Sequence, residues 1–373
     1  MRAAVALPFT GWSAAYAEAQ AGAGPYGPLR SADAHGIKLP AGFTSQIIAR
    51  SGRRVADTGY RWHDAPDGGA TFADGDGWSY VCNSEVPLGA GGVSMISFDA
   101  GGRVVGARRL LSGTTSNCAG GRTPWNTWLS CEEVERGKVF ETYPMTGAAA
   151  VTHRAMGRFK HEAAAVDPER QVVYLTEDEP DGLLYRFVPT RWPDLSAGAL
   201  QVLVAGADTS GTYTWAPVPD PSARPTPTRH QVPGAKIFNG GEGCYYANDT
   251  VWFTTKGDNR VWHVDPAAGR FRLAYDDNLV KPGPAPLTGV DAITGSRFGD
   301  LYVAEDNGSM EICVITPDGV VAPFLRVKGQ PESELCGVAF NPRGDRLYFS
   351  SQRGPSGVLT DGITYCVTGP FRT

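Results

Sequence analysis

The chain has 373 residues, of which 42% are hydrophobic, and it contains 47 Gly and 28 Pro. This composition allows a large core and favours many short strands over long helices. The formal net charge of −5 gives no basic surface for nucleic acid or for an anionic membrane. No run of about 18 apolar residues occurs, so no transmembrane segment is predicted.

Residues 1–29 differ in composition from the rest and are interpreted as an N-terminal segment. Arg2 precedes a weakly apolar stretch, and Ala15, Ala17 and Ala19 have the Ala-x-Ala spacing of export-signal cleavage sites. Proline, glycine and polar residues interrupt the apolar centre. The segment is therefore a candidate remnant of an export signal, and residues 30–373 are predicted to form one domain.

One strand pattern recurs six times in this predicted domain. Each unit has a β-rich segment with a central aromatic residue, preceded by another strand and a polar turn. The six segments are Ser79-Tyr80-Val81, Thr127-Trp128-Leu129, Val173-Tyr174-Leu175, Val251-Trp252-Phe253, Leu301-Tyr302-Val303 and Leu347-Tyr348-Phe349. Their aromatic residues lie 48, 46, 78, 50 and 46 residues apart. A period of about 40 to 50 residues with four strands is typical of propellers, so we predict an all-β, six-bladed β-propeller.

The single long interval falls between the third and fourth units. Residues 191–235 contain a series of prolines and are predicted to be a Pro-rich loop insertion. Helical periodicity is absent, which argues against a doubly wound α/β fold.

A polar residue occupies the start of the first strand in every unit. In a propeller these innermost strands surround the axis, so equivalent positions are expected to form a ring at one end. Carboxylates so close together need compensation to stay ionised, and the usual compensation is a multivalent cation. Oxygen ligands suit Ca²⁺, whereas a thiolate suits a softer transition metal. The predicted ring consists of Asp67, Cys118, Glu162, Glu242, Asp291 and Glu334.

A second acidic set follows the aromatic strands. Because the chain reverses direction at each turn, the ends of these strands return to the face that carries the ring. The set contains Asn83, Glu85, Glu132, Glu133, Glu177, Asp178, Glu179, Glu305 and Asp306. Two units instead carry Lys256 and Gln352-Arg353, which are positioned to meet an anion beside the metals.

Structural roles are the alternative for each of these residues taken alone. Acidic residues at strand ends often serve turns and solvated rims. For Cys118 taken alone, a small buried thiol is the better explanation, and its place in the ring makes a metal ligand an equal one. His161 is equally well explained as a histidine with satisfied hydrogen bonds beside Glu162, and no His-rich zinc site occurs. The sequence has no GxSxG elbow, phosphate-binding Gly loop or HExxH helix, so the common hydrolase motifs do not apply.

A long motif gives the chain a family resemblance. Residues 117–133 read Asn-Cys-Ala-Gly-Gly-Arg-Thr-Pro-Trp-Asn-Thr-Trp-Leu-Ser-Cys-Glu-Glu, which resembles the hallmark of the PhoX-type alkaline phosphatases, bacterial proteins also described as a domain of unknown function. Shorter blocks at residues 160–162, 238–243, 302–306 and 337–342 resemble later parts of that family in the same order. The similarity covers roughly residues 25–370.

The resemblance implies a hydrolase of phosphate monoesters whose axial site holds iron and calcium. By the same resemblance Cys118 would be the thiolate ligand of iron and Lys160 would neutralise the phosphate. A small phosphorylated substrate, a monomer and export to the periplasm or the exterior are also expected. The carboxylate ligands of iron or calcium would be Glu133, Glu162 and Glu242, with Asp67, Glu85, Asp306 and Glu334 as further candidates for calcium.

One departure from the family pattern concerns the phosphate clamp. The family has an Arg-Pro pair directly before the glutamate matched by Glu242, whereas this chain has Gly240 and Gly241. Fixed positive charge on a transferring phosphoryl group is a large catalytic factor, so the activity depends on a substitute. The candidate substitutes are Arg122, Lys256 and Arg353. The chain is also shorter than typical family members, which predicts trimmed loops around the site.

Two other functions fit parts of the pattern. A calcium-dependent lactone or ester hydrolase would use the carboxylate ring but leaves Cys118 unexplained. A non-catalytic propeller would use metals as a structural plug and bind a partner through the face around Trp125, Trp128 and residues 191–235. The loss of the arginine favours this last alternative.

Overall fold

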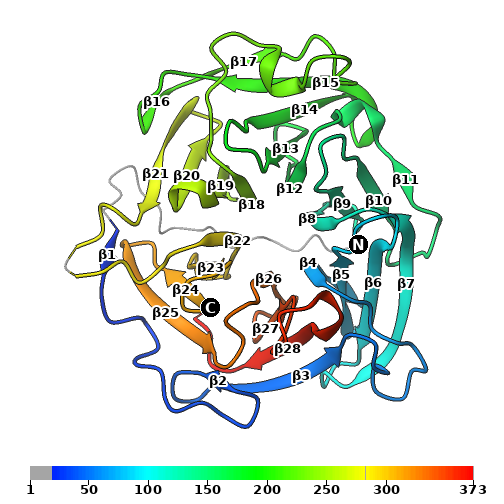
Figure 1. Ribbon diagram of the computed structural model, residues 1–373, viewed down its shortest axis with the longest axis vertical. Coiled ribbons are helices and arrows are strands. Elements are labelled where there is room, and N and C mark those ends of the chain that lie inside the picture. The colour runs from blue at the N-terminus through cyan, green and yellow to red at the C-terminus, as the bar shows by residue number, and fades with distance from the viewer. Residues whose placement is uncertain (1–18, 282, 373) are drawn as a thin grey trace.

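The computed structural model describes residues 19–281 and 283–372. Six β-sheets are arranged in a ring about a common axis, which confirms the predicted six-bladed β-propeller (Figure 1). The described part contains no α-helix and no helix able to cross a membrane. Its helical turns are η1 (Arg154–Met156), η2 (Thr228–His230), η3 (Lys256–Asp258) and η4 (Leu359–Asp361).

Each blade is numbered by the order in which its innermost strand occurs in the chain. Blade one contains β4 (Pro66–Asp74), β5 (Gly77–Ser84), β6 (Gly91–Phe98) and β7 (Val104–Thr114), and blade two contains β8 (Asn117–Arg122), β9 (Trp128–Glu132), β10 (Val139–Thr142) and β11 (Val151–Thr152). Blade three contains β12 (His161–Asp167), β13 (Val172–Glu177), β14 (Leu184–Arg191), β15 (Asp194–Val204) and β17 (Thr214–Pro217). Blade four contains β18 (Gly241–Ala247), β19 (Thr250–Thr255), β20 (Arg260–Asp265), β21 (Arg270–Asp276) and β16 (Ser210–Thr212). Blade five contains β22 (Val290–Gly295), β23 (Leu301–Glu305), β24 (Glu311–Ile315), β25 (Val320–Val327), β1 (Gln20–Ala21) and β2 (Ile37–Lys38), and blade six contains β26 (Leu335–Phe340), β27 (Arg346–Ser351), β28 (Ile363–Thr368) and β3 (Thr44–Arg50).

Blade six closes the ring because it joins strands from both ends of the described chain. Its outer strand β3 pairs antiparallel with β28 (Figure 1). Of the candidate export-signal segment, residues 1–29, the first 18 lie outside the described residues. Residues 20–29 are described, and here β1 pairs with β25 while the Tyr26 hydroxyl lies 2.8 Å from that of Tyr302.

The hydrophobic core lies between neighbouring blades. Tyr174 of blade three packs with Phe253 and Trp262 of blade four, and all three side chains are buried. Between blades six and one, Tyr80 stacks on Tyr348 with ring centroids 5.1 Å apart. Each sheet therefore buries both faces, as the aromatic repeat requires.

The proline-rich region divides into two parts. Residues 194–204 form β15, the regular fourth strand of blade three, while β16 and β17 add edge strands to blades four and three. The following residues, 218–235, contain no strand. Most prolines of the region lie at or after Pro217. The proline content of this second half therefore led the whole region to be predicted as a loop, although its first half forms strands.

The innermost strands share an irregular register near their start. In blades one to five, two residues of the inner strand oppose one residue of its partner directly after the first ladder pair, a β-bulge. The second residue of each inner strand is therefore equivalent around the axis. These residues are Asp67, Cys118, Glu162, Glu242, Asp291 and Cys336. Blade six differs from the predicted ring, because Glu334 precedes β26 and Cys336 takes the equivalent position.

Small residues follow these positions because the inner strands approach each other closely. A Cβ atom on Gly68 would lie 2.4 Å from the Cα of Ala119 in the next blade. A Cβ atom on Gly337 would lie 2.4 Å from the carbonyl oxygen of Asp67, and Gly337 also has φ +66°. Neither neighbour is a flexible side chain, so the strands themselves would have to separate.

We expect Gly337→Ala to lower the free energy of unfolding by about 3 kcal/mol or more, because it adds a backbone clash to positive-φ strain. Gly27→Ala is the matched control, since Gly27 has φ +80° with open space around it and should cost only about 1 to 2 kcal/mol. Guanidinium unfolding followed by tryptophan fluorescence measures both. Equal losses in the two variants would show that the close approach carries no energetic weight.

Candidate metal centre

The predicted inner ring converges at one end of the axis. Asp67, Glu162, Glu242 and Asp291 are buried side chains at the start of their strands. Strand residues alternate between two sides, so the second position of each inner strand faces the same way in every blade. Cys118 occupies the equivalent place in blade two and is partly buried.

A second ring consists of the residue that directly follows the second strand of each blade. The first residue of each inner strand pairs with the last residue of its partner strand, so the next residue returns to the axis beside the inner ring. The second ring contains Glu85, Glu133, Asp178, Lys256, Asp306 and Gln352.

The acid just before the second ring points elsewhere. Glu305 accepts hydrogen bonds from the backbone N–H groups of Thr288, Ser309 and Glu311. Glu177 likewise accepts the hydroxyl of Tyr185 at 2.7 Å and pairs with Arg229 at 3.2 Å. Strand alternation thus separates neighbouring acids that the sequence left equivalent: the first supports the loops and the second joins the axis.

Four groups of possible ligands form a continuous belt around the axis. Within each group, one ligand atom from every residue lies within 4.8 Å of the others. The groups overlap because they share Glu85, Asp291 and Glu334. They are Glu85–Cys118–Glu133, Asp67–Glu85–Glu334, Glu162–Glu242–Asp291 and Asp291–Asp306–Glu334. The structure thus brings together every metal-ligand candidate from the sequence and Asp291 of the predicted ring, and it includes Glu334 although this residue precedes β26.

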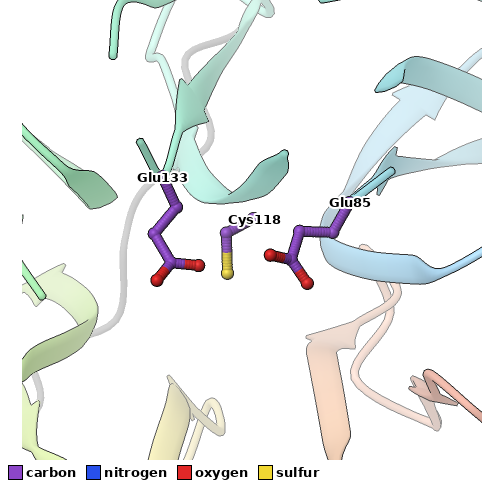
Figure 2. A group of neighbouring side chains, drawn as sticks. All are labelled: Glu85, Cys118 and Glu133. Carbon is purple, nitrogen blue, oxygen red and sulfur yellow. The ribbon is translucent and has the colours of Figure 1, made fainter. Parts of the chain in front are cut away.

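Cys118 lies at the acidic part of this belt formed by blades one to three. Figure 2 shows its sulfur between the carboxyl groups of Glu85 and Glu133. Its Sγ is also 3.0 Å from Oε1 of Glu162. The other oxygen of that carboxyl group, Oε2, is buried without a hydrogen-bond partner among the described residues. A thiol, several carboxyl groups and an orphaned buried oxygen fit a bound cation that accepts both sulfur and oxygen ligands.

Basic side chains compensate only part of the belt. Lys160 Nζ lies 2.9 Å from Glu133 and 2.8 Å from Asp178. Lys256 Nζ lies 2.9 Å from Glu242 and 3.3 Å from Asp306. Both lysines therefore neutralise the belt between blades two and five.

The remaining basic group and one amide contact the carboxyl groups where blade six meets blades five and one. Arg353 lies 3.1 Å from Glu334 and 3.7 Å from Asp306, and Gln352 Nε2 donates to Asp67 at 2.5 Å and to Glu85 at 2.7 Å. An amide carries no charge. Among the described residues, Asp67, Glu85 and Glu162 form no ion pair with a basic side chain, and of the carboxyl groups next to Cys118 only Glu133 does.

Burial and mutual repulsion make the belt hard to ionise. Burial, with Glu85 and Glu334 nearby, raises the pKa of Asp67 well above its usual range. Burial and the neighbouring carboxyl groups likewise raise the pKa of Glu162, and burial and Asp306 raise the pKa of Glu334 to about 7. Burial and the surrounding acids also raise the pKa of Cys118. A multivalent cation would oppose all of these shifts and favour the ligating, deprotonated forms.

The lysines keep their charge despite burial. Burial lowers the pKa of Lys160, but the ion pairs with Glu133 and Asp178 outweigh it and raise the pKa overall. Burial is likewise outweighed at Lys256, where Glu242, Asp291 and Asp306 raise the pKa. Both lysines are therefore lasting positive charges at the axis.

The candidate substitutes for the phosphate clamp differ in place. Lys256 and Arg353 reach the belt, but Arg122 is the last residue of β8, four residues from Cys118 or about 13 Å along the strand. It lines a cavity of about 370 Å³ with Trp128 and Tyr245, at the other end of the inner strands. Arg122 is therefore wrong as a substitute, because strand direction places it away from the acids.

Gly240 leaves little room for a side chain. It has φ +67°, and a Cβ atom there would lie 3.2 Å from the backbone nitrogen of Gly257 and 3.3 Å from Oδ1 of Asp178. Its carbonyl accepts the backbone N–H of Lys256 at 2.8 Å. The local chain path is therefore built around glycine and holds the turn that presents Lys256.

A separate acidic group lies off the axis in blade five and includes Glu305, Glu311 and Cys313. Backbone N–H groups and Arg326 satisfy its carboxyl groups. This group has a structural explanation that the axial belt lacks.

The sequence patterns placed four further members of the centre in the predicted ring or in the second set, without naming them as metal ligands. One rule describes both rings: each contains either the second residue of an inner strand or the first residue after its partner strand. The four are Asp291, Asp178, Lys256 and Gln352.

A six-bladed propeller with a thiol and a belt of carboxyl groups at its axis defines the class: a propeller with a candidate metal centre on its axis. Within this class the chain belongs to the PhoX family: the sequence model described as alkaline phosphatase PhoX matches residues 90–149 and 137–277. These ranges contain Cys118, Glu133 and Glu162, together with Lys160 and Glu242. A comparison with curated protein sequences gives no significant match.

Solved structures show the same fold at low sequence identity. A candidate gluconolactonase is 13% identical with a TM-score of 0.52, covering 92% of this chain and 99% of that chain. A protein of unknown function from Bacteroides thetaiotaomicron is 10% identical with a TM-score of 0.53, covering 87% of this chain and 76% of that chain. These similarities support the propeller architecture.

Proposed function

We propose that the protein is a metal-dependent hydrolase of phosphate monoesters that acts at the axial belt. The contact between Cys118 and Glu162 carries this proposal, because it joins a thiol to a carboxyl group that retains a buried, unpartnered oxygen. Both residues fall within the part of the chain that matches the PhoX family. Membership in that family supports phosphate monoesters as the substrate class, and export from the cytoplasm as the setting.

The residues divide by chemistry into two kinds of metal ligand. Cys118 would hold iron, with Glu133 and Glu162 as neighbouring carboxylate ligands, while the oxygen-only groups suit calcium. When bound, the cations would supply Lewis-acid stabilisation of the phosphoryl oxygens. The calcium ligands would be Glu242, Asp67, Glu85, Asp306 and Glu334, with Asp291 between them.

The basic side chains would bind and orient the substrate. Lys160, Lys256 and Arg353 retain side-chain exposures of 30%, 34% and 27%, so their charged ends can reach a ligand from the carboxyl groups they now contact. A phosphate dianion placed between them gains fixed positive charge where negative charge develops in the transition state. Lys256 and Arg353 would thereby replace the arginine missing at Gly240.

We expect Glu162→Gln to lower kcat/KM for a generic aryl phosphate by at least about 100-fold, because it removes a charged ligand from the belt. Assays on wild type and variant use calcium and iron, with metal content measured in parallel. Glu305→Gln is the control, since Glu305 is also buried but serves backbone N–H groups. Equal turnover by wild type and Glu162→Gln would remove the proposal.

The same assay distinguishes the other two functions. An aryl ester and a lactone are offered beside the phosphate. Turnover of the lactone or ester alone, with calcium but no iron bound, would favour a calcium-dependent lactone or ester hydrolase. Bound metal without turnover of any of these substrates would favour a non-catalytic propeller.

A further inference from the structure

Lys256 interrupts the acidic pattern of the second ring. It begins η3 directly after β19, at the position where four other blades carry a carboxyl group. The equivalent acids are Glu85, Glu133, Asp178 and Asp306. A positive side chain therefore stands in blade four where the pattern of the fold calls for a ligand.

The ammonium group of Lys256 joins two of the ligand groups. It contacts Glu242, which belongs with Glu162 and Asp291, and Asp306, which also belongs with Asp291. Glu242 and Asp291 are 2% and 8% exposed, so solvent compensates them little. In the same group Glu162 keeps its unpartnered Oε2. Lys256 thus takes the place in which a cation would bridge these carboxyl groups.

We propose that Lys256 is a built-in cation that replaces one calcium ion between blades four and five. This inference rests on the proposed function only in that the axial belt binds metal ions. It divides the centre into two parts. Next to Cys118, Glu85 and Glu162 form no ion pair within the described chain and depend on bound metals for positive charge, whereas around Asp291 the ammonium group of Lys256 supplies part of that charge.

The ligands left after removal of Lys256 are all oxygen atoms, and they determine which ion could bind there. Without the ammonium group, Glu242, Asp291 and Asp306 would face each other with only Arg353 nearby, and repulsion between buried carboxylates is costly. Ca²⁺ accepts six to eight oxygen ligands in flexible geometry, which these side chains and water can supply. Methionine is the substitution used to test this, because its side chain is similar in length to that of lysine and carries no charge.

The test counts calcium ions per chain. Wild type, Lys256→Met, Lys256→Arg and the surface control Lys328→Met are stripped with a chelator, equilibrated with Ca²⁺ by dialysis and analysed for bound calcium. Lys256→Met is expected to bind one ion more than wild type, whereas Lys256→Arg and Lys328→Met bind the same number as wild type. The double variant Lys256→Met/Asp306→Asn should lose the additional ion, since it loses one of its ligands.

An unchanged calcium count in folded Lys256→Met would overturn the inference. If that variant does not fold, Lys256→Gln replaces it, because its amide can still donate to Glu242, and the same count decides. Wild-type metal content is read separately. Wild type without metal would remove the proposed function, yet a calcium ion gained by the variant would still support Lys256 as a built-in cation.

Discussion

Cys118→Ser is expected to lose at least about nine-tenths of the bound iron, and with it any visible thiolate-to-iron charge-transfer absorption of the wild type. A serine hydroxyl stays protonated at neutral pH and is a poor substitute for a soft thiolate ligand. The surrounding groups Glu85, Glu133 and Glu162 remain, so calcium binding should be retained. Elemental analysis and a visible spectrum of the purified variant measure both effects.

The chain provides a matched control in Cys336. Its register position in blade six is equivalent to that of Cys118, and it is also close to the belt. Its sulfur, however, donates to the backbone carbonyl of Pro66 at 3.2 Å and belongs to none of the ligand groups. Cys336→Ser should therefore keep its iron and its colour. If Cys118→Ser retained its iron, or if only Cys336→Ser lost it, Cys118 would not be the thiolate ligand.

The two thiols also show how far the sequence could predict the site. The blade count follows from local spacing, because each unit carries its own aromatic strand. The inner ring follows from one position in each unit, and this held for five blades. In the sixth blade, the sequence alignment matched Glu334 to the other carboxyl groups, whereas the strand register matches Cys336 to them. No local sequence pattern marks the β-bulge, so this register could not be read from the sequence.

Long-range features could not be predicted from residue patterns. Closure of the ring pairs β3 with β28, more than 300 residues apart, through a strand that carries no aromatic repeat. The ion pair of Lys256 with Asp306 joins different blades in the same way. By contrast, the distance of Arg122 from the centre follows from the rise of a strand and was available from the sequence.

Lys160→Met is expected to lower kcat/KM for an aryl phosphate by about 100- to 1,000-fold while metal content stays unchanged. The side chain lies between Glu133 and Asp178, is partly exposed, and keeps its charge because these ion pairs raise its pKa. That charge would stabilise the phosphoryl oxygens as negative charge develops on them. Steady-state kinetics and elemental analysis on the same preparation measure the two quantities.

Lys160→Arg separates charge from structure in this prediction. It keeps the positive charge but changes its shape, so it should recover part of the lost kcat/KM without altering metal content. Lys160→Met also leaves Glu133 and Asp178 without their shared cation, which could loosen the iron held beside Cys118. If iron is lost in step with activity, Lys160 supports the metal ligands, and substrate binding must then depend on Lys256 and Arg353. If activity falls while both metals remain, Lys160 acts on the phosphate itself.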